Sequence, residues 1–285
     1  MKYINLNMDR VQYEGHDYQS YSLPADRVNA VLNTENVPEI TLKEENQDKP
    51  VVATILGQWK NPERAEKDYF ITPFYVDAVK NAGGYPVFIA FDKIEEQLEH
   101  FKPQAILLIG GDFDFPADWY VNLDKEISNF KRHEAYQSMI KYAETNKLPV
   151  LGICGGEQAL AGYLGAKIKT NINKDKENIQ INHRPGGAKF IHSVHLDQNS
   201  KLFDVVKQND FMVTSVHHEV VDKENLGNAK VVATAPDGMV EAIEPKNSWS
   251  DFVIGVQWHP ERWATLNNEP SVNLFKSFIE SAKQK

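Results

Sequence analysis

The only cysteine of the 285-residue chain, Cys154, lies in the run Gly152-Ile153-Cys154-Gly155-Gly156. A buried strand is predicted before this run and a helix after it, which is the pattern of a nucleophile elbow with cysteine in place of serine. Small neighbours allow the sharp turn, and the dipole of the following helix favours the thiolate. The Gly155 amide can point at a developing oxyanion. A structural cysteine packed between glycines is the alternative, and this run alone does not decide between them.

The second candidate is the run Trp258-His259-Pro260-Glu261, which follows the apolar segment 252–258. Pro260 restricts His259 to extended backbone angles, in which residues two apart point to the same side. Glu261 can then bond one imidazole nitrogen while the other takes the thiol proton. Alone, the run fits a strand-end histidine beside a solvated glutamate better. Together with Cys154, it supplies the base and the orienting carboxylate of one mechanism.

The third candidate is a pair of glycines, Gly110 and Gly111, which with Asp112 ends a predicted buried strand. Glycines let backbone amides approach a ligand and can supply a second oxyanion donor. An ordinary strand-ending turn is the alternative. The aromatic-rich residues that follow can wall a pocket or form a packed surface loop; they are Phe113, Phe115, Pro116, Trp119 and Tyr120.

Paired histidines, His217 and His218, precede Glu219 and raise the question of a metal site. With one cysteine and no ligand set at a matching spacing, a zinc motif is not indicated. The segment from His192 to His195 resembles a strand with polar positions. The sequence therefore predicts no required metal.

The elements that must position these residues alternate between strand and helix patterns, which predicts βαβ units and a parallel sheet. Predicted strands span 51–57, 85–90, 104–110 and 148–153, and predicted helices span about 73–82, 93–100, 129–146 and 157–164. After about residue 166, short strands joined by turns predict a mixed continuation of the sheet. They span 190–196, 230–235, 239–244 and 252–258, before a last helix at about 272–282.

Composition narrows the class of protein. The net charge is −9 and no long basic run occurs, which argues against nucleic acid or an anionic membrane as the main partner. No run of about 18 apolar residues and no secretory leader are seen, and one cysteine cannot form an internal disulfide, so a cytoplasmic location is expected. Residues 1–49 are polar and without a sustained period, and we interpret them as an N-terminal extension of one main domain, residues 50–285.

In combination, four runs resemble the class I glutamine amidotransferase-like hydrolases, and within them the gamma-glutamyl-gamma-aminobutyrate hydrolase group. They are LLIGGDFDFP (107–116), GICGGEQ (152–158), TSVHHEVVD (214–222) and GVQWHPE (255–261). The resemblance covers about residue 50 to the C-terminus. It implies a three-layer α/β fold: a mostly parallel central sheet flanked by helices, with an antiparallel C-terminal part.

The resemblance also implies an activity, the cleavage of gamma-glutamyl amide bonds. Cys154 would attack the amide carbonyl, His259 would act as base and then as acid, and Glu261 would orient His259. The amides of Gly155 and of Gly111 or Gly110 would hold the oxyanion. Water would then hydrolyse the thioester, which releases glutamate and an amine.

The same resemblance assigns substrate contacts and partners. Gln158 would help to hold the glutamyl end, and we expect Asp112, His217, His218 and Glu219 to lie beside it. No cofactor is expected, the partner is a small gamma-glutamyl substrate, and a homodimer is left open. The alternatives are a glutaminase that supplies ammonia to a synthetase partner and a non-enzymatic binding or regulatory protein that keeps the fold.

Three residues depart from the pattern of the family. Gly155 stands where the hydrolases usually carry arginine, Glu157 where they carry a small or apolar residue, and Glu219 where glutamine is common. One missing base and two added acids predict a preference for a cationic leaving amine, if both acids lie in the pocket.

Overall fold

The computed structural model describes residues 7–13, 16–24, 48–60, 67–111, 113–123, 125–127, 131–170, 172, 181–184 and 190–284. Within these residues the largest sheet has nine strands, in the order β11-β10-β13-β14-β15-β8-β7-β3-β6. Every strand and helix named from the sequence is present, with ends that differ by a few residues.

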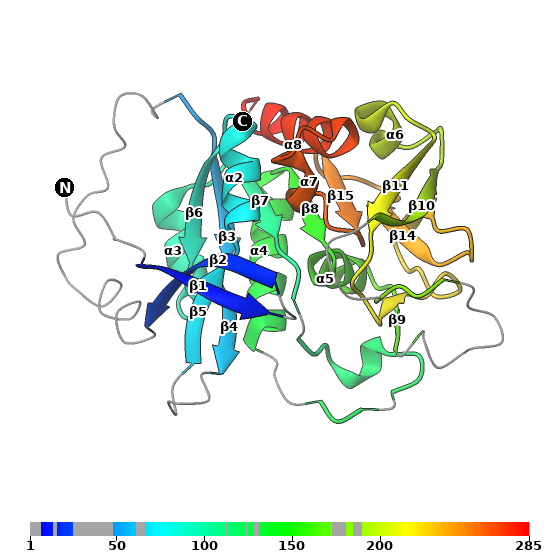
Figure 1. The fold of residues 1–285 in the computed structure, drawn as a ribbon, viewed down its shortest axis with the longest axis horizontal. Coiled ribbons are helices and arrows are strands. Elements are labelled where there is room, and N and C mark those ends of the chain that lie inside the picture. Colours follow the sequence, from blue (N-terminus) through cyan, green and yellow to red (C-terminus); the bar gives the residue numbers. More distant parts are fainter. Residues whose placement is uncertain are drawn as a thin grey trace.

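One half of the large sheet is parallel and the other is antiparallel, as predicted (Figure 1). The parallel strands are β6 (Tyr85–Ile89), β3 (Val51–Ile55), β7 (Ala105–Leu108), β8 (Val150–Ile153) and β15 (Val253–Val256). The antiparallel continuation consists of β14 (Val240–Pro245), β13 (Ala229–Thr234), β10 (Phe190–Leu196) and β11 (Asp210–Thr214).

Helices cover both faces of this sheet, because its central strands are apolar on both sides. Leu107 belongs to the core cluster on one face, while its neighbours Ile106 and Leu108 belong to the cluster on the other. Residues of α2 (Pro73–Asn81), α6 (Lys201–Val206), α7 (Glu261–Ala264) and α8 (Glu269–Ala282) join the first cluster. Residues of α3 (Ile94–Phe101), α4 (Lys131–Asn146) and α5 (Gly155–Tyr163) join the second. The result is the class I glutamine amidotransferase-like α/β fold in three layers.

Two smaller sheets lie beside the large one. The four-stranded sheet has the order β1-β2-β5-β4, from β1 (Asn7–Tyr13), β2 (His16–Pro24), β5 (Lys67–Ile71) and β4 (Gly57–Lys60). Its β2 pairs with β5, so strands from the polar N-terminal stretch join a strand of the predicted main domain. The other pairs β9 (Ile168–Lys169) with β12 (Val220–Val221), and η2 (Ala117–Trp119) is a short 3-10 helix.

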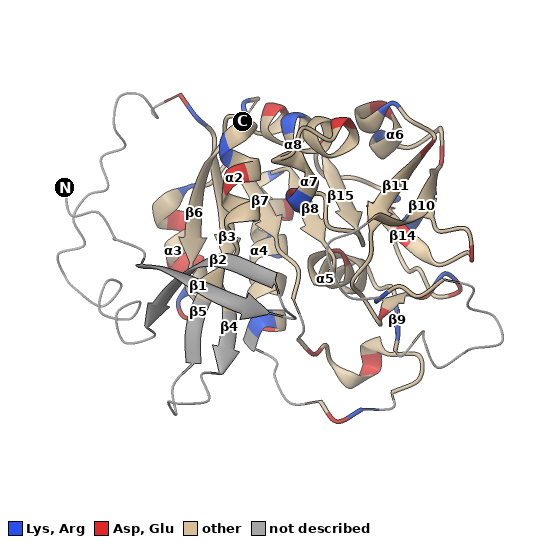
Figure 2. Ribbon diagram, in the orientation of Figure 1, with Lys and Arg blue, Asp and Glu red and all other residues tan. Residues whose placement is uncertain are grey.

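Charges of both signs occur on the surface helices. Helices α6 and α8 each carry acidic and basic residues in Figure 2, so neither helix presents a face of one sign. No helix within the described part of the chain combines the length and the apolar character that a membrane span requires.

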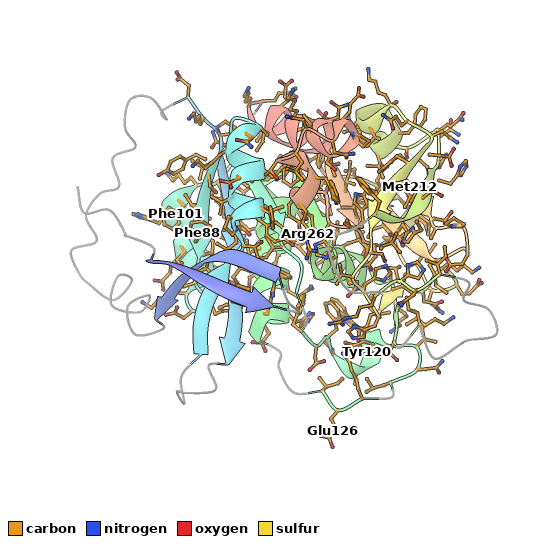
Figure 3. All side chains as sticks on the ribbon, in the orientation of Figure 1. Phe88, Phe101, Tyr120, Glu126, Met212 and Arg262 are labelled. Carbon is orange, nitrogen blue, oxygen red and sulfur yellow. The ribbon has the colours of Figure 1, made fainter. Side chains whose placement is uncertain are left out.

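The fold brings the candidate residues to one edge of the sheet. Strands β15, β8 and β7 are neighbours and parallel, so their carboxyl ends lie side by side. His259 follows β15, Cys154 follows β8, and Gly110 follows β7. Figure 3 labels Arg262, at the start of α7, which follows His259 in the chain. Arg262 lies in the middle of the view, between Phe88 in the parallel half and Met212 in the antiparallel half. Open α/β folds bind ligands at such an edge.

Candidate active site

Cys154 lies on a sharp turn between β8 and α5. Its backbone angles are φ 53° and ψ −113°, a conformation that residues other than glycine rarely adopt. The flanking glycines are needed for this turn. A Cβ on Gly152 would lie 2.7 Å from the Gly156 carbonyl oxygen, and one on Gly156 would lie 2.1 Å from that of Leu108. The Cys154 amide donates to Val256 at 2.8 Å, which ties the turn to β15.

His259 and Glu261 form a buried pair beside this turn. His259 Nδ1 lies 2.8 Å from Glu261 Oε1. The predicted reason for the contact was wrong: Pro260 has helical angles (φ −67°, ψ −25°), so the start of α7 and not an extended segment brings Glu261 to the ring. Burial alone would lower the pKa of His259, but the charges of Glu261 and Cys154 and hydrogen bonds to both raise it to about 9.

Gly110 shows how closely these groups approach one another. A Cβ built on Gly110 would lie 3.1 Å from Cys154 Cβ, 3.1 Å from His259 Cε1 and 3.0 Å from the Tyr75 hydroxyl. The Gly110 amide donates to that hydroxyl at 3.0 Å. This hydrogen bond occupies Gly110, so of the two predicted alternatives we retain Gly111 as the second oxyanion donor.

Arg132, on α4, holds the segment that carries these glycines. Its Nη2 donates to the carbonyl oxygens of Ile109 at 3.0 Å and Gly110 at 2.7 Å, although the side chain is only 6% exposed. The guanidinium also lies 4.7 Å from the ring centre of Phe113. Sequence reasoning missed Arg132 and Tyr75, because each lies on a helix whose pattern explains it as ordinary packing or surface.

A pocket of about 270 Å³ opens over Cys154, near the lower end of the range for small-molecule sites, roughly 300–1,000 Å³. Seven of the predicted site residues line it: Gly111, Cys154, Gly155, Gln158, His217, His218 and Glu219. Four further residues complete the lining: Phe113, Asp114, Lys125 and Val216. Asp112 lies outside the described residues. Phe115, by contrast, is fully buried and stacks on Trp119, so it belongs to the core.

Lys125 is the cation that the sequence did not indicate in this pocket. Its Nζ lies 2.8 Å from Asp114 Oδ1 and 2.7 Å from Glu219 Oε1. Burial alone would lower the pKa of Lys125, but hydrogen bonds to Asp114 and Glu219 raise it above its usual range. Lys125 therefore stays charged and links two acids across the pocket wall.

Two predicted substrate contacts also hold the protein together. Gln158 Nε2 donates to the Glu219 carbonyl oxygen and to Gln257 Oε1, both at 2.9 Å. His218 Nδ1 lies 2.6 Å from Arg184 Nη1. The amide nitrogen of Gln158 is thus engaged, which leaves its oxygen as the atom able to face a substrate.

The expectation that Glu157 adds a negative charge to the pocket was wrong. Glu157 is fully buried, and its Cγ lies 2.7 Å from where a Gly255 Cβ would be, on the side of β15. Neither carboxyl oxygen has a hydrogen-bond partner in the described part of the chain. Burial first, and then the charges of Glu241 and Cys154, hold the pKa of Glu157 well above its usual range. The carboxyl is therefore neutral in the folded protein.

This burial predicts a pH-dependent cost to stability. Because the pKa of Glu157 is raised in the folded state, the folded protein keeps a proton that the unfolded chain releases as the pH passes an ordinary glutamate pKa. The free energy of unfolding should therefore fall as the pH rises above that value, and Glu157→Gln should remove this fall. Urea unfolding at about pH 5 and about pH 8 measures this fall in the free energy of unfolding. The exposed change Glu224→Gln is the control; equal pH dependence of Glu157→Gln and wild type would count against it.

The comparisons with known proteins agree with the class that the fold defines. The model of the Peptidase C26 family matches residues 50–261, so the chain belongs to this family. A glutamine amidotransferase-like protein of Rickettsia prowazekii is 30% identical over 287 residues, covering 83% of this chain and 99% of that protein. The gamma-glutamyl-gamma-aminobutyrate hydrolase of Escherichia coli O157:H7 is 26% identical, covering 83% of this chain and 94% of that protein.

A solved structure shares the fold at low sequence identity. It is the glutaminase domain of Trypanosoma brucei CTPS with bound acivicin, with a TM-score of 0.58 and 14% identity, covering 83% of this chain and 95% of that chain. Family membership indicates a hydrolase that acts on amide bonds.

Proposed function

We propose that the protein is a cysteine hydrolase that cleaves gamma-glutamyl amide bonds of small gamma-glutamyl amines or peptides. The observation that carries this proposal is the contact of His259 with both Glu261 and Cys154, together with the pocket that Cys154 lines. The name of the Escherichia coli relative supports the gamma-glutamyl class of substrate.

The state of the site before substrate binds follows from the protonation of His259. With a pKa of about 9, His259 carries a proton at neutral pH, and its charge favours the Cys154 thiolate. Glu261 Oε1 accepts from Nδ1, which leaves Nε2 of His259 to serve Cys154 and the substrate.

The reaction then proceeds in two stages. The thiolate attacks the amide carbonyl carbon, and the Gly155 and Gly111 amides stabilise the oxyanion. His259 gives its proton to the leaving amine, the C–N bond breaks, and a thioester remains. His259 next takes a proton from water, the hydroxide attacks the thioester, and the C–S bond breaks. Glutamate leaves, and the cysteine–histidine ion pair is restored.

The pocket charges suit the zwitterionic end of a glutamyl group. Asp114 and Glu219 can receive an α-ammonium, and Lys125 between them can receive an α-carboxylate. Without Glu157 these three side chains sum to one negative charge, because two carboxylates face one ammonium. Because the glutamyl end would take up these charges, they do not select the leaving amine, and a cationic leaving amine remains an expectation from the sequence alone.

A substrate panel tests the proposal. Glutamate release would be followed from gamma-glutamyl derivatives of a polyamine, of gamma-aminobutyrate and of a neutral amine, and ammonia release from free glutamine. We expect turnover of gamma-glutamyl amines, fastest with the polyamine. Ammonia release from glutamine alone would favour the glutaminase alternative. Failure of a glutamine-like chloroketone to label Cys154 near neutral pH would contradict both enzymatic functions and favour a binding protein.

Lys125 provides a prediction on substrate affinity. Lys125→Gln leaves Asp114 and Glu219 without their shared cation, so KM should rise on the order of 10-fold, about 1.4 kcal/mol, while kcat changes less. Steady-state kinetics of glutamate release measures both constants. The exposed α4 residue Lys141, changed to glutamine, is the matched control. An unchanged KM in Lys125→Gln would show that this cation does not meet the substrate.

A further inference from the structure

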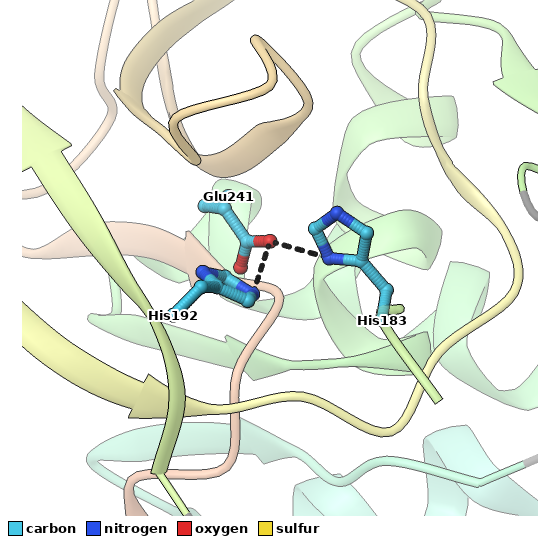
Figure 4. Close-up of side chains that lie close together, drawn as sticks. All are labelled: His183, His192 and Glu241. Atoms are coloured by element: carbon cyan, nitrogen blue, oxygen red, sulfur yellow. Dashed lines mark ion pairs between the residues drawn. The ribbon is translucent and has the colours of Figure 1, made fainter. Parts of the chain in front are cut away.

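A second cluster of titratable side chains lies apart from the proposed cysteine chemistry. His183, His192, His217 and Glu241 come from four separate segments and are 0%, 4%, 3% and 0% exposed. Glu241 Oε1, on β14, lies 3.4 Å from His183 Nδ1, from His192 Nε2 and from His217 Nε2. Figure 4 shows His183 and His192 directed at this one carboxylate.

The outward nitrogen of each imidazole faces an oxygen that accepts hydrogen bonds. These pairs are His183 Nε2 with Asp237 Oδ2 (2.9 Å), His192 Nδ1 with the Ser193 carbonyl (3.0 Å) and His217 Nδ1 with the Glu219 carbonyl (3.0 Å). A neutral imidazole has one N–H, and these contacts assign it to the outward nitrogen in all three rings. With this assignment the inward nitrogens present lone pairs to Glu241, and the Ser215 hydroxyl lies 3.3 Å from His183 Nδ1.

Lone pairs that face a carboxylate in a buried site need a cation between them. Among the residues that the structure describes, His192 Nε2, His217 Nε2 and both Glu241 oxygens are buried without a hydrogen-bond partner. Leaving such atoms unpaired costs free energy on the order of 1–3 kcal/mol each. A proton or a metal ion would remove this cost.

The distances favour a metal ion. An imidazolium that donates to a carboxylate lies about 2.7–2.9 Å from it, whereas all three distances to Glu241 Oε1 are 3.4 Å. Ligand atoms placed tetrahedrally about 2.0–2.1 Å from a zinc ion are separated by about 3.3–3.4 Å. The outward hydrogen bonds to a carboxylate and to carbonyls are those that orient metal-binding histidines.

We propose that His183, His192 and Glu241 bind a divalent transition metal ion, Zn²⁺ foremost. The ligand atoms of these three residues lie within 4.8 Å of one another. Two imidazole nitrogens and one carboxylate oxygen are donors that zinc accepts. This proposal replaces the sequence-based expectation of no metal, and it is independent of the proposed hydrolase activity.

The site would join the antiparallel half of the sheet to the pocket wall. His192 lies on β10 and Glu241 on β14, while His217 belongs to the segment that lines the pocket. His217 Nε2 faces the same Glu241 oxygen, and the Glu219 carbonyl accepts from both His217 and Gln158, so the ion would lie beside the wall that contacts α5. We therefore assign the ion a structural and positioning role.

Metal analysis of the full chain, purified without a histidine tag, tests the proposal. We expect about one equivalent of zinc per chain by elemental analysis, a lower Tm after treatment with a strong chelator, and recovery of Tm on adding Zn²⁺. Co²⁺ loading should give the intense d–d absorption of a tetrahedral site. The proposal would be overturned if the purified chain held no metal, its Tm did not change on adding Zn²⁺, and Co²⁺ gave no such absorption.

Variants locate the ligands. His192→Ala and Glu241→Gln should each lower bound zinc at least 10-fold, the size of effect seen for lost ligand support. His195→Ala is the matched control, since His195 lies on the same strand with a side chain 64% exposed, and it should keep full occupancy. Cys154→Ala should keep the metal, and zinc loss in this variant would contradict the assignment to a separate site.

Discussion

Replacing Cys154 with alanine is expected to lower the release of glutamate from gamma-glutamyl amines by at least about 10⁴-fold. The covalent step needs a nucleophile at this turn, and no other thiol exists in the chain. His259→Ala should cost nearly as much, because the members of such a set act as a unit and their losses do not add. Glutamate release, with covalent labelling by the chloroketone followed by mass spectrometry, measures both effects.

Stability measurements separate this loss from misfolding. Cys154 is half-buried, and alanine adopts its positive-φ backbone at a cost similar to that of cysteine, so Tm should change little. A second variant, Cys154→Ser, keeps the size of the side chain but replaces the thiolate with a weak nucleophile, and it should also be inactive. Substantial activity in either variant would mean that Cys154 is not the nucleophile and that the proposed function is wrong.

The fold could be predicted because its signals are local. The apolar runs that become β3, β7 and β8 are short, and Gly83 and Gly165, both with positive φ, end α2 and α5 where the pattern predicted. Parallel neighbours must end at the same edge of a sheet, so Cys154 and His259 could be placed together from their positions after two strands. The only further information needed was that β8 and β15 are parallel neighbours, which the structure shows.

The parts that could not be predicted depend on rotation about a helix or on distant segments. Residues 155–162 of α5 are all buried, so no polar face indicates that Gln158 reaches the pocket while Glu157 points into the core. Lys125 lies in a stretch without periodicity. The ligands of the proposed metal site are spread from His183 to Glu241, and only the pairing of the antiparallel strands brings them together.

Arg132→Met is expected to lower kcat about 10²-fold, the size of effect found when one oxyanion donor is lost, and to cost about 3 kcal/mol of stability. Arg132 binds the carbonyls of Ile109 and Gly110, and a Cβ on Gly111 would lie 2.4 Å from its Nη1. The side chain therefore shapes the segment that presents the Gly111 amide. Without it the two buried carbonyls lose their charged donor, and the amide is free to turn away from the oxyanion.

Two further variants distinguish positioning from packing. Tyr136→Phe removes the hydroxyl that donates to the Ile109 carbonyl at 2.6 Å and accepts from Arg132 Nη2 at 2.8 Å, so it should lower stability. Because Arg132 can still bond the Gly110 carbonyl, kcat should fall less than in Arg132→Met. Arg132→Lys keeps the charge but not the planar fork, so it should rescue stability more than kcat. KM should stay close to the wild-type value in all three, because no substrate contact is removed. If kcat fell only in proportion to the folded fraction, Arg132 would be a packing residue and the orientation of Gly111 would not depend on it.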